Sequence, residues 1–232
     1  MFLFITDNVA SDIVTLPAEE SKHCVRVLRM RRGDSLLVTD GCGTVAEAQV
    51  LEPDAAGCVV ELKKRNFVAP HWGLHIAVAP TKNIDRFEWF VEKAVEVGVS
   101  EITPIVCEHS ERRQLNGDRL QRIVVAAVKQ SLKAHIPILN PSMTLCDFLS
   151  LPLPEQRFVC HCDGTRASLP ALYQRGMPAV VLVGPEGDFS PAEIAAAHDA
   201  GFRSTILGEA RLRTETAALY ATVALNMMNC EL

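Results

Sequence analysis

The chain has 232 residues, of which 48% are hydrophobic, enough for one large domain or two modest domains with cores of their own. Charged residues make up 22% and the formal net charge is −5, which excludes a strongly basic nucleic-acid coat protein.

The N-terminal part is expected to form a small β-structure with one helix. Runs of aliphatic and β-branched residues predict strands at 2–5, 35–40, 45–52 and 58–65, with turns at 41–43 and 54–57. Pro17 and the acidic pair Glu19 and Glu20 begin a helix that Gly33 ends. Strands so closely spaced are typical of a small barrel, and residues 66–73 are the predicted linker.

A different rhythm begins at Leu74, where apolar strand-like runs alternate with helical segments. Strands are predicted at 75–80, 102–106, 157–162, 179–184 and 204–208. Helices are predicted to start at Asn83, at Asn116, at Ser190 and near Thr214. This alternation predicts an α/β domain with a mainly parallel sheet covered on both faces. We therefore expect two domains, 1–68 and 74–232.

The eight cysteines contain no C-x-x-C pair. Cys160 and Cys162 flank His161, an arrangement that would suit a metal clip, but on a strand the thiols share one face and the imidazole takes the other. Core packing is the stronger interpretation, so we expect reduced cysteines and no metal. The apolar run at the N-terminus is too short for a signal peptide and no segment is long enough for a membrane span, which predicts a cytoplasmic protein without membrane association.

Two glycine-bearing stretches near the C-terminus carry the clearest chemical signal. In the first, Gly184 and Gly187 follow a buried strand and enclose Glu186, while Ser190 begins a helix. Ligands of open α/β sheets lie beyond the carboxyl ends of strands, so this turn is a candidate site. A plain strand–turn–helix connection is the alternative, and Glu186 between two glycines favours function.

In the second stretch, Gly208 again follows a strand, and Arg211 and Arg213 are expected to point to the same side. Thr214 is the predicted N-cap of the last helix, and Glu215 in the first turn suits the helix dipole, so structure alone could explain that carboxylate. Arg213 precedes a helix N-terminus, where a lone cation is disfavoured. We therefore expect it to pair with a carboxylate or an anionic substrate.

Phosphate-binding motifs are absent from these loops. The chain has no G-x-x-x-x-G-K-[ST] sequence and no G-x-G-x-x-G after the first α/β strand, which argues against a nucleotide-dependent α/β enzyme.

The pairing of VLVGPEGDFSPAE (181–193) with LGEARLRTETAALYA (207–221) resembles the C-terminal signature of SPOUT methyltransferases. In that class the last segment forms a trefoil knot that binds S-adenosylmethionine. Within it, HCVRVLRMRRGD (23–34), APTKNIDRFEWFVEKAVEVGV (79–99), Glu111-Arg112 and AAVKQS (126–131) resemble the RsmE family of 16S rRNA (uracil-N3)-methyltransferases. The resemblance covers nearly the whole chain and implies a PUA-like RNA-binding β-barrel over 1–68 and a knotted methyltransferase domain over 74–232.

The resemblance also implies a cofactor site made mostly of backbone groups in the two loops. The residues carried over are Leu182, Gly184, Pro185, Glu186, Gly187, Leu207, Gly208, Leu212, Arg213, Thr214 and Ala217. The adenine would lie against apolar side chains such as Leu207 and Leu212.

Methylation at N3 of uridine requires removal of a proton and stabilisation of the charge that spreads onto the carbonyl oxygens. We expect Arg213 to stabilise the uracilate oxygen and Glu186 or Glu215 to assist deprotonation, with Glu186 ranked first because the helix start already explains Glu215.

A buried target base has to be turned outward, so basic side chains are expected to hold the RNA backbone. The candidates are Lys22, His23, Arg26, Arg29, Arg31, Arg32, Lys82, Arg86, Lys93, Arg112 and Arg113. A solvated basic helix end is the alternative for the N-terminal group, and a packed histidine is the alternative for His23.

The chain departs from the family pattern at Asp188, where a second glycine is more common, and at Lys129, where an acidic residue is common. The apolar last helix and the resemblance together imply a homodimer, with 16S rRNA, inside the small ribosomal subunit, as the other partner. Alternatives are a SPOUT enzyme for another RNA nucleotide and an inactive RNA-binding knot protein.

Overall fold

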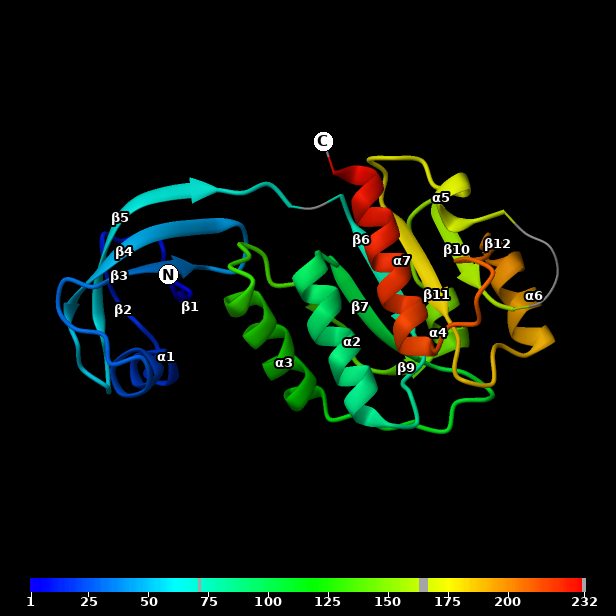
Figure 1. Ribbon diagram of the computed structural model, residues 1–232, viewed down its shortest axis with the longest axis horizontal. Coiled ribbons are helices and arrows are strands. Elements are labelled where there is room, and N and C mark those ends of the chain that lie inside the picture. The colour runs from blue at the N-terminus through cyan, green and yellow to red at the C-terminus, as the bar shows by residue number, and fades with distance from the viewer. Residues whose placement is uncertain (71, 163–166, 231–232) are drawn as a thin grey trace. The chain divides into compact units, whose positions relative to one another are not determined.

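The computed structural model describes residues 1–70, 72–162 and 167–230 (Figure 1). The chain divides into two compact units. One consists of Met1–Pro70 with Val125–Ile136, and the other of His71–Val124 with Pro137–Leu232.

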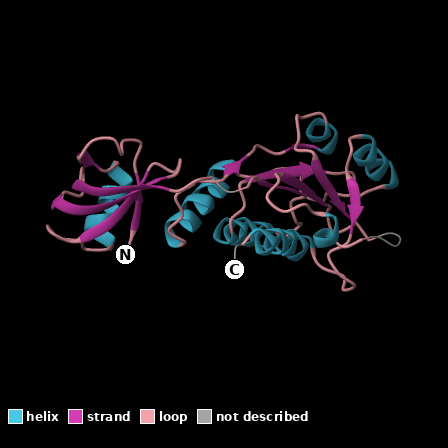
Figure 2. Ribbon diagram, turned by 90° about the horizontal axis from the view of Figure 1, so that it is seen from above, coloured by secondary structure: helices cyan, strands magenta, loops and turns pink. Residues whose placement is uncertain are grey.

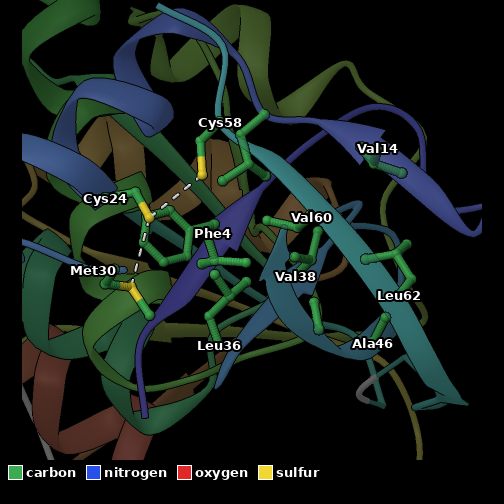
Figure 3. Close-up of a cluster of buried hydrophobic side chains, with 13 residues drawn as sticks. Phe4, Val14, Cys24, Met30, Leu36, Val38, Ala46, Cys58, Val60 and Leu62 are labelled. Carbon is green, nitrogen blue, oxygen red and sulfur yellow. Dashed lines mark hydrogen bonds between the residues drawn. The ribbon is translucent and has the colours of Figure 1, made fainter. Parts of the chain in front are cut away.

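The first unit is built on a five-stranded sheet that curls over an apolar core. Its strands, in the order β1-β3-β4-β5-β2, are β1 (Leu3–Ile5), β2 (Ile13–Thr15), β3 (Ser35–Thr39), β4 (Thr44–Glu52) and β5 (Val59–Phe67). Only β1 and β3 pair in parallel; the other pairs are antiparallel. Alternate residues such as Leu36, Val38, Val60 and Leu62 face the core (Figure 3). Four strands agree with the sequence, and β2 was not predicted.

The helix of this unit is shorter than predicted. It consists of α1 (Ala18–Lys22) and one π-helical turn, η1 (His23–Val27), and therefore ends before Gly33. The Sγ atom of Cys24 lies 3.6 Å from Sδ of Met30 and 3.9 Å from Sγ of Cys58 (Figure 3). Burial raises the pKa of the Cys24 thiol to about 12, so this cysteine behaves as a core hydrophobe.

Residues 125–136 are hydrogen-bonded to the curled sheet of the first unit. The amide of Gly43 donates to the carbonyl oxygen of Ala134, and the amide of Ile136 donates to that of Gly41. A Cβ atom on Gly41, whose φ is +72°, would lie 2.5 Å from Cδ1 of Ile136. A side chain at position 41 would therefore be strained by the backbone conformation and would require the Ile136 side chain to move.

Lys129 belongs to this same segment and pairs with Glu20, which lies in the same unit but far away in the sequence. Its Nζ atom lies 2.8 and 2.9 Å from the two carboxylate oxygens of Glu20, and 5.7 Å from the ring centre of Phe4. The side chains are only 20% and 15% exposed, so solvent screens the pair weakly.

Replacing Lys129 by Glu is expected to lower the free energy of unfolding by about 1.5–3 kcal/mol, the value of a hydrogen-bonded charge pair, because two carboxylates would then face each other. Chemical denaturation measures the change. The swapped double variant, Lys129→Glu with Glu20→Lys, should recover most of it. An unchanged midpoint for Lys129→Glu would show that the pair contributes nothing.

The second unit contains a parallel sheet, which confirms the predicted α/β class. Its strands run in the order β12-β10-β11-β6-β7-β8, and β9 pairs with β7. They are β6 (Leu74–Val78), β7 (Glu101–Val106), β8 (Ile138–Leu139), β9 (Met143–Thr144), β10 (Gln156–Cys160), β11 (Ala179–Val183) and β12 (Arg203–Thr205). The short strands β8 and β9 were not predicted, and β12 ends before the predicted Gly208.

Helices cover both faces of this sheet (Figures 1 and 2). They are α2 (Ile84–Val97), α4 (Leu145–Leu149), α5 (Leu169–Leu172), α6 (Pro191–Asp199) and α7 (Thr214–Asn229). The division between the two units falls inside a further helix, α3 (Gly117–Gln130). Helices α2 and α7 lie side by side, and α7 packs on β6 and β11 (Figure 1). Helices α4 and α6 contact each other and share a core cluster with Ala77, Val180 and Leu182. The described helices include none long and apolar enough to cross a membrane.

A buried polar cluster joins β6 to β7 in the second unit. His75, which is 5% exposed, has Nε2 at 2.7 Å from Oγ1 of Thr103 and Nδ1 at 3.6 Å from the Glu101 carboxylate. The Asn140 amide donates to Thr103 and to Glu101. Burial lowers the pKa of His75, and the opposing attraction of Glu101 is the smaller effect.

Stability is therefore expected to fall in mild acid. The pKa of His75 is lower in the folded state than its value of 6.5 in the unfolded chain. Its contribution to the free energy of unfolding is therefore complete above pH 6.5. The contribution is lost as the pH falls below 6.5, because the unfolded chain then binds a proton that the folded state does not. The slope should approach about 1.4 kcal/mol per pH unit for this group. Urea unfolding between pH 7.5 and 5 measures it. A His75→Gln variant should show a flatter curve, and two parallel curves would contradict the assignment.

Candidate functional site

A pocket of about 770 Å³ opens beyond the carboxyl ends of β10, β11 and β12 in the second unit. Three stretches of chain line it, residues 160–162, 183–188 and 205–214, together with Ala217. Pairing of β10 with β11 ends at Cys160 and Val183, and the loops that follow line the pocket. This is the position at which parallel α/β sheets bind their ligands.

The first loop of the pocket runs from Gly184 to the start of α6. A Cβ on Gly184 would lie 3.0 Å from the ring of buried Phe189, so a side chain there would press on the ring. Ser190 caps α6, with Glu193 completing a capping box. The loop is thus held at both ends, and residues 184–188 line the pocket.

The second loop leads from β12 into α7. The helix begins at Thr214, and Arg213 occupies the N-cap position without a side-chain cap. The predicted N-cap role of Thr214 is therefore wrong. Its hydroxyl instead donates to the carbonyl oxygen of Gly184 at 3.1 Å. This bond ties the two pocket loops together.

Most residues predicted to bind a cofactor lie around this one pocket. They are Gly184, Pro185, Glu186, Gly187, Leu207, Gly208, Leu212, Arg213, Thr214 and Ala217. Leu182 is not among the lining residues; it is fully buried in the sheet core against α4 and α6.

The three predicted catalytic residues have different surroundings. Glu186 is exposed at the pocket, and its Oε1 accepts the backbone N–H of Lys82 at 2.9 Å. Arg213 is exposed on the pocket wall, and no hydrogen bond or ion pair reaches its guanidinium from the described part of the chain. Glu215 is 8% exposed, does not line the pocket, and has Oε1 at 3.9 Å from Nε of Arg86.

The lining residues that were not predicted to bind the cofactor include Cys160, His161, Cys162, Thr205 and Ile206. These five lie at or just beyond the ends of β10, which neighbours β11, and of β12, which neighbours β10 on its other side. The signal that could have found them is their position at strand ends. Strand order, which the sequence does not display, decides which ends meet.

Three of the predicted RNA-binding residues of the second unit share a smaller pocket of about 430 Å³. Lys82, Arg112 and Arg113 line it with Glu111 and Gln114. Nζ of Lys82 lies 2.7 Å from Glu111, whose hydrogen bond and charge raise the pKa of Lys82. The Arg112 guanidinium donates to the carbonyl oxygen of Lys82 at 2.9 Å.

Two other basic candidates of this unit are committed to acidic neighbours. Arg86 faces Glu215, and Lys93 bonds Glu92 and Glu96 on its own helix.

The basic candidates of the first unit form one exposed group. Its members, named here the N-terminal basic cluster, are Lys22, Arg26, Arg29, Arg31 and Arg32. No ion pair is made by these five side chains within the part of the chain that the structure describes. His23 is half-buried with its ring 6.2 Å from that of Phe4, so packing accounts for it.

Two family models match the chain. A model described as an RNA methyltransferase domain covers residues 69–226, and one described as an RNA methyltransferase PUA domain covers residues 16–63. The chain belongs to the RNA methyltransferase family. The family expected from the sequence motifs, and with it the class of enzyme, is confirmed.

Curated relatives of this RNA methyltransferase carry one name. The chain is 28% identical to Ribosomal RNA small subunit methyltransferase E of Synechocystis sp., covering 96% of this chain and 75% of the relative. It is also 28% identical to the protein of that name from Mycobacterium tuberculosis, covering 97% and 91%.

Solved structures share its fold over almost the entire length. A probable rRNA-methyltransferase from Porphyromonas gingivalis is 39% identical, with a TM-score of 0.89 and coverage of 99% and 98%. Ribosomal RNA small subunit methyltransferase E from Neisseria gonorrhoeae, bound to S-adenosyl methionine, is 26% identical with the same TM-score and coverage.

Proposed function

We propose that this protein transfers a methyl group from S-adenosylmethionine to N3 of a uridine in 16S rRNA. The observation that carries the proposal is the pocket beyond β10, β11 and β12, which gathers the two glycine-bearing loops around one space. The gonococcal relative, which has the same fold, is described with S-adenosyl methionine bound.

The residues of the pocket fit this cofactor. Its volume of about 770 Å³ lies in the range that small-molecule sites occupy. In the described part of the chain no acceptor takes the backbone N–H groups of residues 207–212, so these groups are available to a ligand. Leu207 and Leu212 add apolar walls on which an adenine ring would rest. When bound, S-adenosylmethionine supplies an activated methyl group on a sulfonium.

The chain's own residues have to prepare the uracil. N3 carries a proton at neutral pH and needs a base, and the resulting negative charge needs a cation. Glu186 reaches the pocket with one carboxylate oxygen held by the Lys82 amide, so its second oxygen is available as the proton acceptor. Arg213 lies on the opposite loop, and its guanidinium has no partner among the residues that the structure describes. Glu215, paired with Arg86, is the second candidate base.

The decisive experiment compares methylated nucleosides in small-subunit RNA from cells with and without the gene by mass spectrometry. The proposal expects 3-methyluridine to disappear and to return with the wild-type gene. Loss of another modified nucleotide would indicate a different RNA target. An unchanged nucleoside profile would indicate an RNA-binding protein without this activity.

In the same proposal, residues 1–68 form a PUA-like RNA-binding domain and residues 74–232 a methyltransferase domain with a C-terminal trefoil knot. Support for the knot comes from the strand order, because the chain must return from edge strand β12 to lay α7 over the central strands β6 and β11. The substrate is 16S rRNA within the small ribosomal subunit, which places the enzyme in the cytoplasm.

The N-terminal basic cluster is expected to hold RNA phosphates. Affinity for a 16S fragment should then fall steeply with salt, because each phosphate contact releases counterions. Replacing Arg31 and Arg32 by Ala should make the log–log salt slope shallower by about 0.7–0.9 for each contact removed. Fluorescence anisotropy from 50 to 300 mM KCl measures both effects.

The matched control replaces Lys63 and Lys64 by Ala, which removes the same charge from the exposed end of β5. It should leave the slope near the wild-type value. Equal slopes for wild type and the Arg31/Arg32 variant would remove this cluster from the RNA interface.

A second copy of the chain is the proposed partner of α7. Tyr220, Val223, Ala224 and Met227 recur at the spacing of one helix face, and Tyr220 and Met227 are 48% and 71% exposed. An apolar stripe left open on a long helix favours association. Sedimentation equilibrium tests the homodimer, and a monomer at micromolar concentration would contradict it.

A further inference from the structure

Asp188 occupies an unusual backbone position in the first pocket loop. Its φ is +62°, in the left-handed region that glycine prefers and that aspartate tolerates through local hydrogen bonds. The turn is closed by the Asp188 amide, which donates to the carbonyl oxygen of Pro185 at 2.9 Å. A residue kept in this conformation needs compensating contacts, and Asp188 has them on two sides.

The carboxylate of Asp188 bridges two loops of the pocket. Oδ1 accepts the N–H of Phe189 in its own loop at 2.8 Å, and Oδ2 accepts the N–H of Cys162 at 2.8 Å. Pairing of β10 with β11 ends at Cys160 and Val183, so Cys162 lies beyond the last ladder position. The carboxylate therefore continues the link between these strands into the stretch where they line the pocket.

The other side of the same residue is held by the loop after β7. Nδ1 of His109 lies 2.9 Å from the carbonyl oxygen of Asp188, and since a carbonyl only accepts, Nδ1 carries the proton. This hydrogen bond raises the pKa of His109. A Cβ on Gly187 would lie 3.0 Å from Cβ of His109, so a side chain at position 187 would crowd the histidine.

We propose that Asp188 is a positioning residue that sets the width of the cofactor pocket by holding the 184–188 loop to Cys162. The inference rests on the proposed function, because it concerns the same S-adenosylmethionine site. Both carboxylate oxygens are committed to backbone N–H groups, so Asp188 acts through the loops. It is not a second base beside Glu186.

Two variants separate the backbone of Asp188 from its carboxylate. Asp188→Gly suits the left-handed conformation but removes the bridge, and Asp188→Asn keeps the shape but has only one side-chain oxygen for two N–H donors. Both should bind S-adenosylhomocysteine at least about tenfold more weakly by calorimetry, the effect of losing one hydrogen bond to a charged group. In the ligand-free protein, exchange of the Cys162 amide should be faster by at least about tenfold. The KM for S-adenosylmethionine should rise far more than kcat falls.

The control is Glu155→Gln, which removes one exposed negative charge from the same unit and should behave as wild type. S-adenosylhomocysteine lacks the sulfonium charge. If S-adenosylmethionine alone bound more weakly to the variants, Asp188 would act by attracting that charge and the positioning role would be wrong. Wild-type affinity and wild-type Cys162 exchange in Asp188→Gly would also overturn it. A wild-type protein that binds neither ligand would instead refute the proposed function.

Discussion

Arg213→Ala is expected to lower kcat for RNA methylation by about 100–1000-fold while the Kd for S-adenosylmethionine changes by less than about threefold. The reason is the state of the guanidinium in the fold. It stands at the N-cap of α7, on the pocket wall, with no partner in the described part of the chain. A cation at a helix N-terminus is electrostatically disfavoured. An anion that enters the pocket would therefore be stabilised by both the guanidinium and the helix N-terminus.

The charge that develops on a uracil oxygen during N3 methylation is such an anion. Because it appears only as the proton leaves, a cation directed at it stabilises the transition state more than the bound substrate. Arg213→Lys should retain part of the rate, since an ammonium keeps the charge and loses the planar pair of donors.

Single-turnover kinetics with saturating cofactor, together with calorimetry of cofactor binding, measures the Arg213 effect. Arg122→Ala is the matched control, because Arg122 is exposed on α3 and lines neither pocket. Full turnover by Arg213→Ala with intact cofactor binding would eliminate the assignment.

Glu186→Gln is expected to reduce kcat at pH 7 by about 100-fold, within the contribution of a positioned general base. The reduction in kcat should become smaller as the pH rises, because a larger fraction of the uracil is then already deprotonated and needs no base. A residue that only shaped the loop would give a loss independent of pH. The glutamine keeps the acceptor for the Lys82 amide, so the loop contact at 2.9 Å survives the change.

Glu215→Gln serves as the comparison, because it removes the other candidate base. Glu215 is buried opposite Arg86, so its loss should lower the melting temperature by leaving that guanidinium without its charge partner. Its rate defect should not depend on pH. If Glu215→Gln showed the pH-dependent defect and Glu186→Gln did not, the two roles would be exchanged.

Local patterns in the chain were sufficient for much of this structure. The alternation of strands and helices after Leu74 predicted the parallel sheet, because this alternation and the helix caps can be recognised from neighbouring residues. Asn83 and Ser190 do cap α2 and α6. The short strands β2, β8 and β9 escaped prediction because two or three residues carry no readable period.

Contacts between residues that are distant in the sequence could not be predicted from those local patterns. Lys129 looked like an isolated departure from the family, and the fold supplies its partner in Glu20, 109 positions away. Thr214 resembled an N-cap, yet its hydroxyl bonds Gly184 because the two loops meet in space. Leu182 looked like a pocket residue, but strand alternation turns it into the core.

By itself, the sequence determined the class of protein, the family and the two loops that carry the chemistry, because glycine positions, strand–helix rhythm and family motifs are properties of neighbouring residues. Only the tertiary structure decided which strand ends meet at the pocket. It thereby brought Cys160–Cys162 beside the glycine loops, buried Glu215 against Arg86 and engaged Asp188 in a bridge. These outcomes depend on strand order and burial, which are established only when the entire sheet packs. They cannot be predicted from patterns among neighbouring residues.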